Sequence, residues 1–150
     1  MKEPATILMD QRILDSLANV STATIAMQLF KRGFRNCYLR GVKPLYSGTQ
    51  TFVAPAFTLR NIPMREDFGD MAILTKPEYP QRKAIETTPP GCCLVSDACS
   101  VVSVGILGDI LAERLRVRGV VAVVPVGGVC LRGDSARRRS DCGQPVDRSD

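Results

Sequence analysis

The segment that most constrains the fold runs from residue 92 to residue 124. Cys92–Ala98 is an apolar run of the kind found in strands buried on both faces. A glycine-bearing turn, Gly105–Gly108, leads into a helix over Asp109–Arg118, and Val120–Val124 is typical of a second buried strand. If the two strands share a sheet, the helix makes a right-handed crossover between parallel strands. The segment therefore predicts an α/β fold with a βαβ unit at 92–124.

Two helices are predicted ahead of this unit. Apolar residues at helical spacing predict the first over about residues 5–18: Ile13, Leu14 and Leu17. Ser21 can cap the second helix, which runs to about Arg32. Gly33 suits the left-handed position that often follows a helix.

A strand, a loop and a short helix are predicted between these helices and the βαβ unit. Residues 51–62 alternate as a strand does, and Pro55 places that strand at a sheet edge or a bulge. Residues 63–80 carry turn signals and predict a loop. Pro80 can begin a short helix through Glu86, which Pro89-Pro90-Gly91 ends.

The chain is long enough for one domain with its own core. It has 150 residues, of which 45% are hydrophobic and 23% charged, as in globular proteins. Its longest apolar runs are far too short to span a membrane, so we expect no membrane segment. Glu3, Asp10 and Arg12 interrupt the amino-terminal residues, which argues against a signal peptide and favours a cytoplasmic protein.

Cysteine and histidine usage narrows the possible chemistry. The chain has six cysteines without a CxxC spacing, and it has no histidine. Zinc fingers, histidine-based catalytic triads and histidine metal ligands are therefore excluded. A metal would need oxygen ligands, which favours magnesium, manganese or calcium. Cys92, Cys93 and Cys99 lie in an apolar run and are expected to be reduced, buried thiols.

The net charge of +5 raises the question of a nucleic-acid partner. The most basic run is Arg137–Arg139, but the same tail carries four acids: Asp134, Asp141, Asp147 and Asp150. Aromatic residues, which would stack on bases, make up only 5% of the chain. We therefore expect a solvated tail of mixed charge and no nucleic-acid partner.

The βαβ unit also predicts where a ligand would bind. In open α/β sheets, ligands bind beyond the carboxyl ends of the strands, here the loops after Ala98 and Val124. The helix after the first loop begins with residues whose backbone amides favour an anion: Gly108, Asp109, Ile110 and Leu111. Ordinary helix capping is the alternative explanation. The second loop, Pro125–Leu131, contains neither an arginine for a carboxylate nor an acid for a metal.

Five stretches, taken together and in order, resemble one known family. They lie within residues 10–128 and are VSTATIAMQL (20–29), GVKPL (41–45), AFTLRNIPMRED (56–67), YPQRKAIETTPPG (79–91) and GDILAERLRVRGVVAVV (108–124). The chain resembles the ribonuclease E regulator-like family, which includes the class II 4-hydroxy-4-methyl-2-oxoglutarate/4-carboxy-4-hydroxy-2-oxoadipate aldolases. Many members carry the older label demethylmenaquinone methyltransferase.

This resemblance implies a swivelling β/β/α domain, assembled as a homotrimer with sites between subunits. Aldolase members are lyases that cleave 2-oxo-4-hydroxy dicarboxylates to pyruvate and a second oxo acid, and they also decarboxylate oxaloacetate. A magnesium or manganese ion polarises the pyruvyl carbonyl and stabilises the enolate. The helix start that holds their substrate through backbone amides corresponds here to Gly108, Asp109, Ile110 and Leu111.

The sequence departs from the family pattern in the loop that carries the polar groups. The family loop is approximately Asp-Gly-Gly, an aromatic or aliphatic residue, then an arginine that binds substrate and an aspartate that leads to the metal. Here Val126 replaces the first aspartate, Cys130 the arginine and Leu131 the metal aspartate. Arg132 and Asp134 are weak substitutes, because they stand two and three positions late. Without a nearby base, Cys130 is not expected to be a nucleophile.

The tail beyond this loop does not resemble the family. We predict a partial α/β domain over residues 1–129 and an irregular, disordered tail over 130–150, which has few apolar residues. Loss and replacement of the carboxyl-terminal part, for example by a change of reading frame near codon 125, is one explanation. A divergent but genuine carboxyl terminus is the other.

Two residues near the predicted strand ends have alternative roles. Asp97 either forms the turn after its strand or belongs to the shell of a metal. Arg60 either reaches the substrate or forms a surface salt bridge.

Two functions therefore stay open. The first is a divalent-metal-dependent lyase acting on a small 2-oxo acid, weak or inactive here because the Arg-Asp loop is missing. The second is a non-enzymatic, regulator-like protein that binds a ribonuclease.

Overall fold

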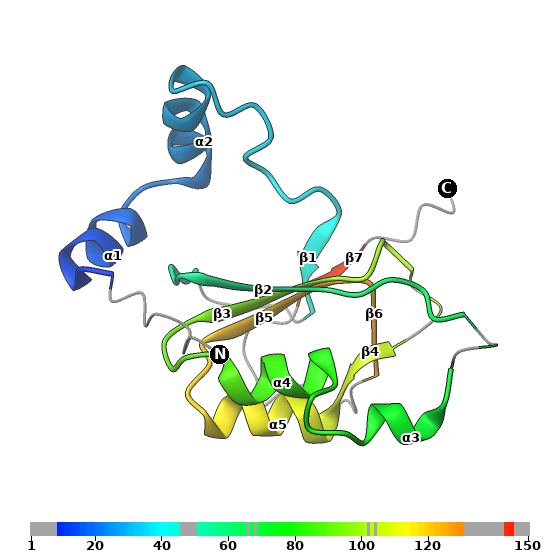
Figure 1. The fold of residues 1–150 in the computed structure, drawn as a ribbon. Helices are drawn as coiled ribbons and strands as arrows, with labels where there is room; N and C mark the ends of the chain where they lie inside the picture. Colours follow the sequence, from blue (N-terminus) through cyan, green and yellow to red (C-terminus); the bar gives the residue numbers. More distant parts are fainter. Residues whose placement is uncertain are drawn as a thin grey trace.

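The computed structural model describes residues 9–45, 51–65, 67, 69–101, 103, 105–130 and 143–145, with the backbone alone at 71, 130 and 143–145. Figure 1 shows a small sheet with helices packed on one of its faces and others lying away from it.

A three-stranded parallel sheet forms the centre of the fold. Its order is β2 (Ala56–Arg60), β3 (Cys93–Asp97) and β5 (Ala122–Val126). The chain passes from β3 to β5 through α5 (Asp109–Val117). β3 and β5 pair in parallel from Cys93 opposite Ala122 to Asp97 opposite Val126. The predicted α/β class and the βαβ unit at 92–124 are therefore confirmed.

The core lies between this sheet and two helices, α4 (Pro80–Thr87) and α5, which run side by side beneath it (Figure 1). Leu115 of α5 is only 1% exposed. Burying a side chain of this size stabilises the fold by about 1.5–3 kcal/mol. The buried apolar cluster consists of Ile85, Leu94, Leu107, Ala112, Leu115 and Val123.

The thiols at the start of β3 belong to the interior. Cys92 and Cys93 are free and buried, as predicted. Cys99 is also a free thiol, but the prediction that it is buried is wrong, because it lies exposed in the loop after β3.

Two boundaries within the βαβ unit differ from the prediction. The segment Gly105–Gly108 is not a turn but strand β4, which pairs in parallel with β6 (Gly128–Cys130). The last strand, predicted at Val120–Val124, is β5 and begins two residues later. The reason is that the Val120 N–H still donates to the Leu115 carbonyl (3.0 Å) where α5 ends.

The region ahead of β3 follows the prediction in part. β2 is shorter than the predicted strand over 51–62, because it begins only after Pro55, and it lies at the edge of the sheet as predicted. Pro80 begins α4 as predicted. The predicted loop over 63–80 contains a helical turn, α3 (Met71–Leu74), whose N-cap Asp70 accepts a hydrogen bond from the Ala72 N–H (2.9 Å). Four residues are too few to show a helical period in the sequence.

Two helices precede the sheet and lie away from it (Figure 1): α1 (Gln11–Ala18) and α2 (Thr22–Lys31). The Asp10 carboxylate caps α1, so the helix begins later than the predicted residue 5. Ser21 caps α2 by accepting from the Thr24 N–H (3.2 Å), and Gly33 has φ +92°, both as predicted. Neither helix contains a buried residue.

A short antiparallel pair completes the described structure. β1 (Val42–Pro44) pairs with β7 (Gly143–Pro145). Of the predicted irregular tail over 130–150, only Cys130 and 143–145 are among the described residues. The domain boundary at residue 129 therefore stays a prediction.

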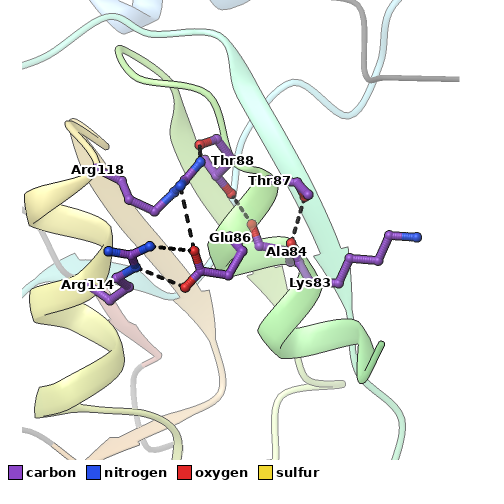
Figure 2. Close-up of polar contacts among 7 residues, drawn as sticks. All are labelled: Lys83, Ala84, Glu86, Thr87, Thr88, Arg114 and Arg118. Carbon is purple, nitrogen blue, oxygen red and sulfur yellow. Dashed lines mark hydrogen bonds and ion pairs between the residues drawn. The ribbon is translucent and has the colours of Figure 1, made fainter. Parts of the chain in front are cut away.

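A group of charged side chains joins the ends of α4 and α5 (Figure 2). The Arg114 guanidinium donates two hydrogen bonds to the Glu86 carboxylate, Nε to Oε1 (2.9 Å) and Nη2 to Oε2 (2.7 Å). Arg118 adds an ion pair to Glu86 (3.6 Å) and donates to the Thr88 carbonyl (3.3 Å). Thr88 itself is fully buried, and its hydroxyl donates to the Ala84 carbonyl (2.6 Å). These contacts fix how the two helices meet.

The first prediction concerns the pH dependence of this contact. The hydrogen bonds from Arg114 lower the pKa of Glu86. Its contribution to the free energy of unfolding is therefore present above the ordinary glutamate value of 4.5 and is lost as the pH falls through the lowered pKa. We expect Glu86→Gln to have a lower free energy of unfolding than the wild type at pH 7. The difference between the two proteins should shrink toward pH 3. Denaturant titrations of both proteins across this pH range measure the difference.

Glu78→Gln is the matched control, because Glu78 forms no ion pair among the described residues. A stability difference between wild type and Glu86→Gln that stays constant from pH 7 to pH 3 would contradict the role assigned to Arg114.

Candidate functional site

The carboxyl ends of the central strands meet, as the sequence predicts. The Ala98 N–H, just after β3, donates to the Val126 carbonyl at the end of β5 (2.9 Å). The Gly128 N–H then donates to the Val101 carbonyl (3.1 Å). The loop after β3 and the connection from β5 to β6 are thus joined by backbone hydrogen bonds, and they form one edge of the sheet where an α/β fold binds its ligands.

Gly127 lies at the centre of this junction. A Cβ atom placed on it would lie 2.7 Å from the Ala98 Cβ and 3.3 Å from the Val101 carbonyl oxygen. The same position is 3.7 Å from the Ile106 side chain of β4. A side chain at position 127 would collide with Ala98, so only glycine fits here without a shift of its neighbours.

The start of α5 has the features expected of an anion site. Its N-cap is Gly108, with extended backbone (φ −109°, ψ 173°), and no side chain caps the helix. Ile110, in the first turn, is 85% exposed, while Leu111 is half-buried against the core. The first amides of a helix have no acceptor within the helix, so Ile110 and Leu111 can donate to a partner outside it, and the helix dipole favours a negative one. The four residues predicted to bind an anion lie at this end of α5: Gly108, Asp109, Ile110 and Leu111.

Asp97 and Arg60 end neighbouring strands and interact with each other. The Asp97 carboxylate accepts a hydrogen bond from the Cys99 N–H (2.9 Å), which makes it the turn former after β3. Its other oxygen lies 3.6 Å from the Arg60 Nε, in an ion pair whose side chains are both largely open to solvent. The turn-forming and salt-bridge alternatives for these two residues are therefore the ones observed.

Asn61 connects the ends of β2 and β3 from the side. Its backbone N–H donates to the Asp97 carbonyl (2.7 Å). Its side-chain amide donates to the hydroxyl of Ser96, which is buried (3.0 Å). Asn61 cannot be recognised from the sequence as part of this edge, because an asparagine after a strand is also an ordinary turn residue.

The loop after β3 contains two residues in the left-handed region. Cys99 has φ +55° and Ser100 has φ +59°, and neither is a glycine. A left-handed conformation costs a residue with a side chain about 1–2 kcal/mol. This loop is therefore strained, and no signal in the sequence predicted it.

The described residues do not fit a magnesium or manganese ion. Within them, no three histidine, cysteine, aspartate or glutamate side chains come together as a metal site. Asp97, which the sequence offered as a shell residue, already binds Cys99 and Arg60. Cys130 is described by its backbone alone, in β6, and the other loop positions lie outside the described residues: Leu131, Arg132 and Asp134.

Comparison with protein families identifies this architecture. A family model described as RraA-like, Aldolase/RraA, matches residues 11–137. The chain belongs to the RraA-like family. No curated protein matches the chain.

Solved structures with the RraA-like arrangement are similar over nearly the whole chain. RraAS2 of Streptomyces coelicolor, an unusual member of the RNase ES inhibitor RraA protein family, is 27% identical with a TM-score of 0.74, over 97% of this chain and 65% of that one. A protein from Pseudomonas syringae pv. tomato is 22% identical with a TM-score of 0.69, over 91% of this chain and 56% of that one, and shows the fold alone. The chain thus spans less than two thirds of these structures.

The residues that match the family model include the central sheet, the βαβ unit and the start of α5. No helix in this part is both long enough and apolar enough to cross a membrane.

The second prediction tests the close approach at Gly127. We expect Gly127→Ala to lower the free energy of unfolding by about 1–3 kcal/mol, because the new methyl group overlaps the Ala98 side chain. In an Ala98→Gly background, where that methyl group is absent, the same change should cost less. Thermal or denaturant unfolding of the four proteins gives the coupling between the two sites. Equal costs in both backgrounds would show that the two segments do not touch as described.

Proposed function

We propose that the chain binds the carboxylate of a small 2-oxo acid at the start of α5 and that its metal-dependent lyase activity is weak or absent. The observation that carries the proposal is the uncapped first turn of α5, which begins directly after Gly108, the register partner of Cys130 in β6. The membership of the RraA-like family, whose model is described as Aldolase/RraA, supports the lyase class.

The binding step needs only groups that this chain has. The amides of Ile110 and Leu111 belong to the first turn, where no intrahelical carbonyl is available to them. A carboxylate placed there would accept charge-assisted hydrogen bonds from these N–H groups. Gly108, without a side chain, leaves the approach to the backbone open.

The chemical step lacks its partners among the described residues. Cleavage next to a carbonyl requires a cation to stabilise the enolate, and in the aldolases a metal supplies it. The described residues offer no such metal site. Cys130 and Leu131 stand where the resembled family has its arginine and aspartate, and Arg132 and Asp134 are displaced from those positions. We therefore assign no metal-dependent catalytic step to the described residues. A cytoplasmic homotrimer remains part of this proposal on the resemblance alone.

The third prediction tests whether pyruvate is bound by the backbone amides of α5 or by its side chains. Ile110→Pro removes one amide hydrogen at the second helical position, in the first turn where proline is tolerated. Ile110→Ala keeps that amide and changes only an exposed side chain. We expect the proline variant to bind pyruvate about tenfold or more weakly, the value of one hydrogen bond to a charged group, and the alanine variant to bind like the wild type. Isothermal titration calorimetry measures both, with thermal unfolding to check that each variant folds.

Turnover is measured on the same preparations. With oxaloacetate and magnesium or manganese, the wild-type chain should release little pyruvate above the metal blank. Chelator-sensitive turnover comparable to that of an intact family member would contradict the proposed inactivity and would implicate Arg132 and Asp134. Equal pyruvate affinity in the proline and alanine variants would contradict the amide site.

A second candidate function is regulation of a ribonuclease. One observation favours it: RraAS2, at 27% identity and a TM-score of 0.74, belongs to a family of RNase ES inhibitors. Such a role requires a surface rather than a metal, so the missing polar loop does not argue against it.

The fourth prediction follows from this candidate. We expect the chain to slow RNA cleavage by an RNase E-type ribonuclease at chain concentrations well below that of the RNA, because the contact is with the enzyme and not with the substrate. An unrelated ribonuclease of the pancreatic type is the control and should be unaffected. No inhibition of the RNase E-type enzyme at micromolar chain would exclude this function.

A further inference from the structure

The interval between Asp15 and Glu66 carries charge of one sign only. Between Asp15 and Glu66 there is no aspartate or glutamate. The same interval contains seven cations: Lys31, Arg32, Arg35, Arg40, Lys43, Arg60 and Arg65. Since the whole chain has a net charge of only +5, positive charge is concentrated here rather than spread over the molecule. Such a concentration is the electrostatic footprint of an anionic partner.

Five of these cations alternate with aromatic residues in one segment. We call residues 30–43 the basic-aromatic segment; it runs from the last turns of α2 through an irregular connection to β1 (Figure 1). Its aromatic side chains are solvent-exposed, Phe30 by 54%, Phe34 by 60% and Tyr38 by 73%. The chain has only eight phenylalanines and tyrosines, so this segment holds a large share of them.

The cations of the basic-aromatic segment are not neutralised by acidic side chains of the described residues. All of them are exposed, and none forms an ion pair within the described residues: Lys31, Arg32, Arg35, Arg40 and Lys43. The Arg35 guanidinium lies 5.5 Å from the centre of the Phe30 ring, so a charge and an aromatic face are already adjacent. Arg32 donates to the Gln28 carbonyl at the end of α2 (3.0 Å). The segment therefore presents positive charge and aromatic faces together to solvent.

We propose that the basic-aromatic segment is a binding surface for single-stranded RNA. Proteins that bind single strands combine a positive track along the phosphates with aromatic side chains on which the bases stack. Phe30, Phe34 and Tyr38 supply the aromatic faces, and the five cations supply the charge. An amphipathic membrane helix would instead need these residues on one helical face, whereas most of the segment lies beyond the end of α2 at Lys31.

This inference revises the expectation of no nucleic-acid partner. That expectation rested on the arginines of the tail and on the low aromatic content of the whole chain. The described structure shows that three of the eight aromatic residues lie exposed among cations that form no ion pair within the described residues. The proposal does not depend on lyase activity or on contact with a ribonuclease, and its failure would leave both of those untouched.

The fifth prediction is measured with a fluorescein-labelled oligouridine of about twelve nucleotides, by fluorescence anisotropy on the full chain. We expect binding that weakens as salt rises, with a slope of about −0.7 for each phosphate contact. Phe34→Leu/Tyr38→Leu should weaken binding at least fivefold, since stacking on each ring contributes about 1–3 kcal/mol. Leucine keeps these positions apolar, so any contact that needs only apolar surface should survive the change.

Charge reversal supplies the matched control. Lys31→Glu/Arg40→Glu should weaken oligouridine binding by tenfold or more and reduce the salt slope, because two phosphate contacts are lost. Lys76→Glu/Lys83→Glu changes the net charge of the chain equally, but at exposed sites outside the segment, and should bind with nearly wild-type affinity. Circular dichroism confirms that each variant keeps its helices.

Four outcomes would overturn the proposal. Equal loss of binding in both charge-reversal variants would mean non-specific attraction to a basic protein. Binding to vesicles of anionic lipid but not to oligouridine would assign the segment to a membrane surface. Sedimentation showing a concentration-dependent oligomer that the leucine variant retains, with no RNA binding, would assign it to a second copy of the chain. Stronger binding to duplex RNA or to oligodeoxythymidine than to oligouridine would exclude single-stranded RNA as the preferred partner.

Discussion

The burial of β3 between two parallel neighbours is the constraint on which the structure depends. Cys93–Asp97 pairs with β2 on one side and with β5 on the other, so both edges of this strand are used. Because its backbone groups are satisfied in this way, its side chains Cys93 and Leu94 can be buried. Helices α4 and α5 then cover the sheet, and the Glu86–Arg114 contact holds them together.

The same constraint places the candidate site. Parallel strands end at a common edge, and here Asp97 and Val126 are register partners at that edge. The loops that follow are drawn together by backbone hydrogen bonds, which leaves room only for glycine at position 127. Helix α5, which returns the chain from β4 to β5, begins near these loops with an uncapped first turn. A scaffold of this kind can hold an anion through backbone amides whatever side chains the neighbouring loop carries. Architecture and anion binding can therefore persist where turnover is lost.

Long apolar runs and helix ends could be predicted from the sequence, because their causes are local. Ser21 and Gly33 mark the ends of α2 through capping and a left-handed backbone, which depend on neighbouring residues alone. Strand β4 could not be predicted in this way. Gly105–Gly108 contains two glycines, and its strand conformation comes from pairing with β6, more than twenty residues away.

The candidate site likewise combines features with local causes, which the sequence predicts, and features that depend on distant contacts, which it does not. The uncapped start of α5 could be found from Gly108 and the residues after it. The roles of Asn61 and Gly127 depend on contacts with residues far away in the chain, Ser96 for one and Ala98 for the other. The left-handed backbone at Cys99 and Ser100 runs against the preference of both residues, so it too comes from the surrounding structure. The basic-aromatic segment was overlooked because composition averages over the chain, whereas exposure is a property of particular side chains.

The most direct test of the central claim is a nuclear magnetic resonance titration of the isotope-labelled chain with pyruvate, first alone and then with manganese. The account predicts that pyruvate shifts the amide signals of Asp109, Ile110 and Leu111, and that manganese adds no selective broadening of these signals. Broadening of the α5 amides that requires both manganese and pyruvate would reveal a metal held beside the ligand and would contradict the account.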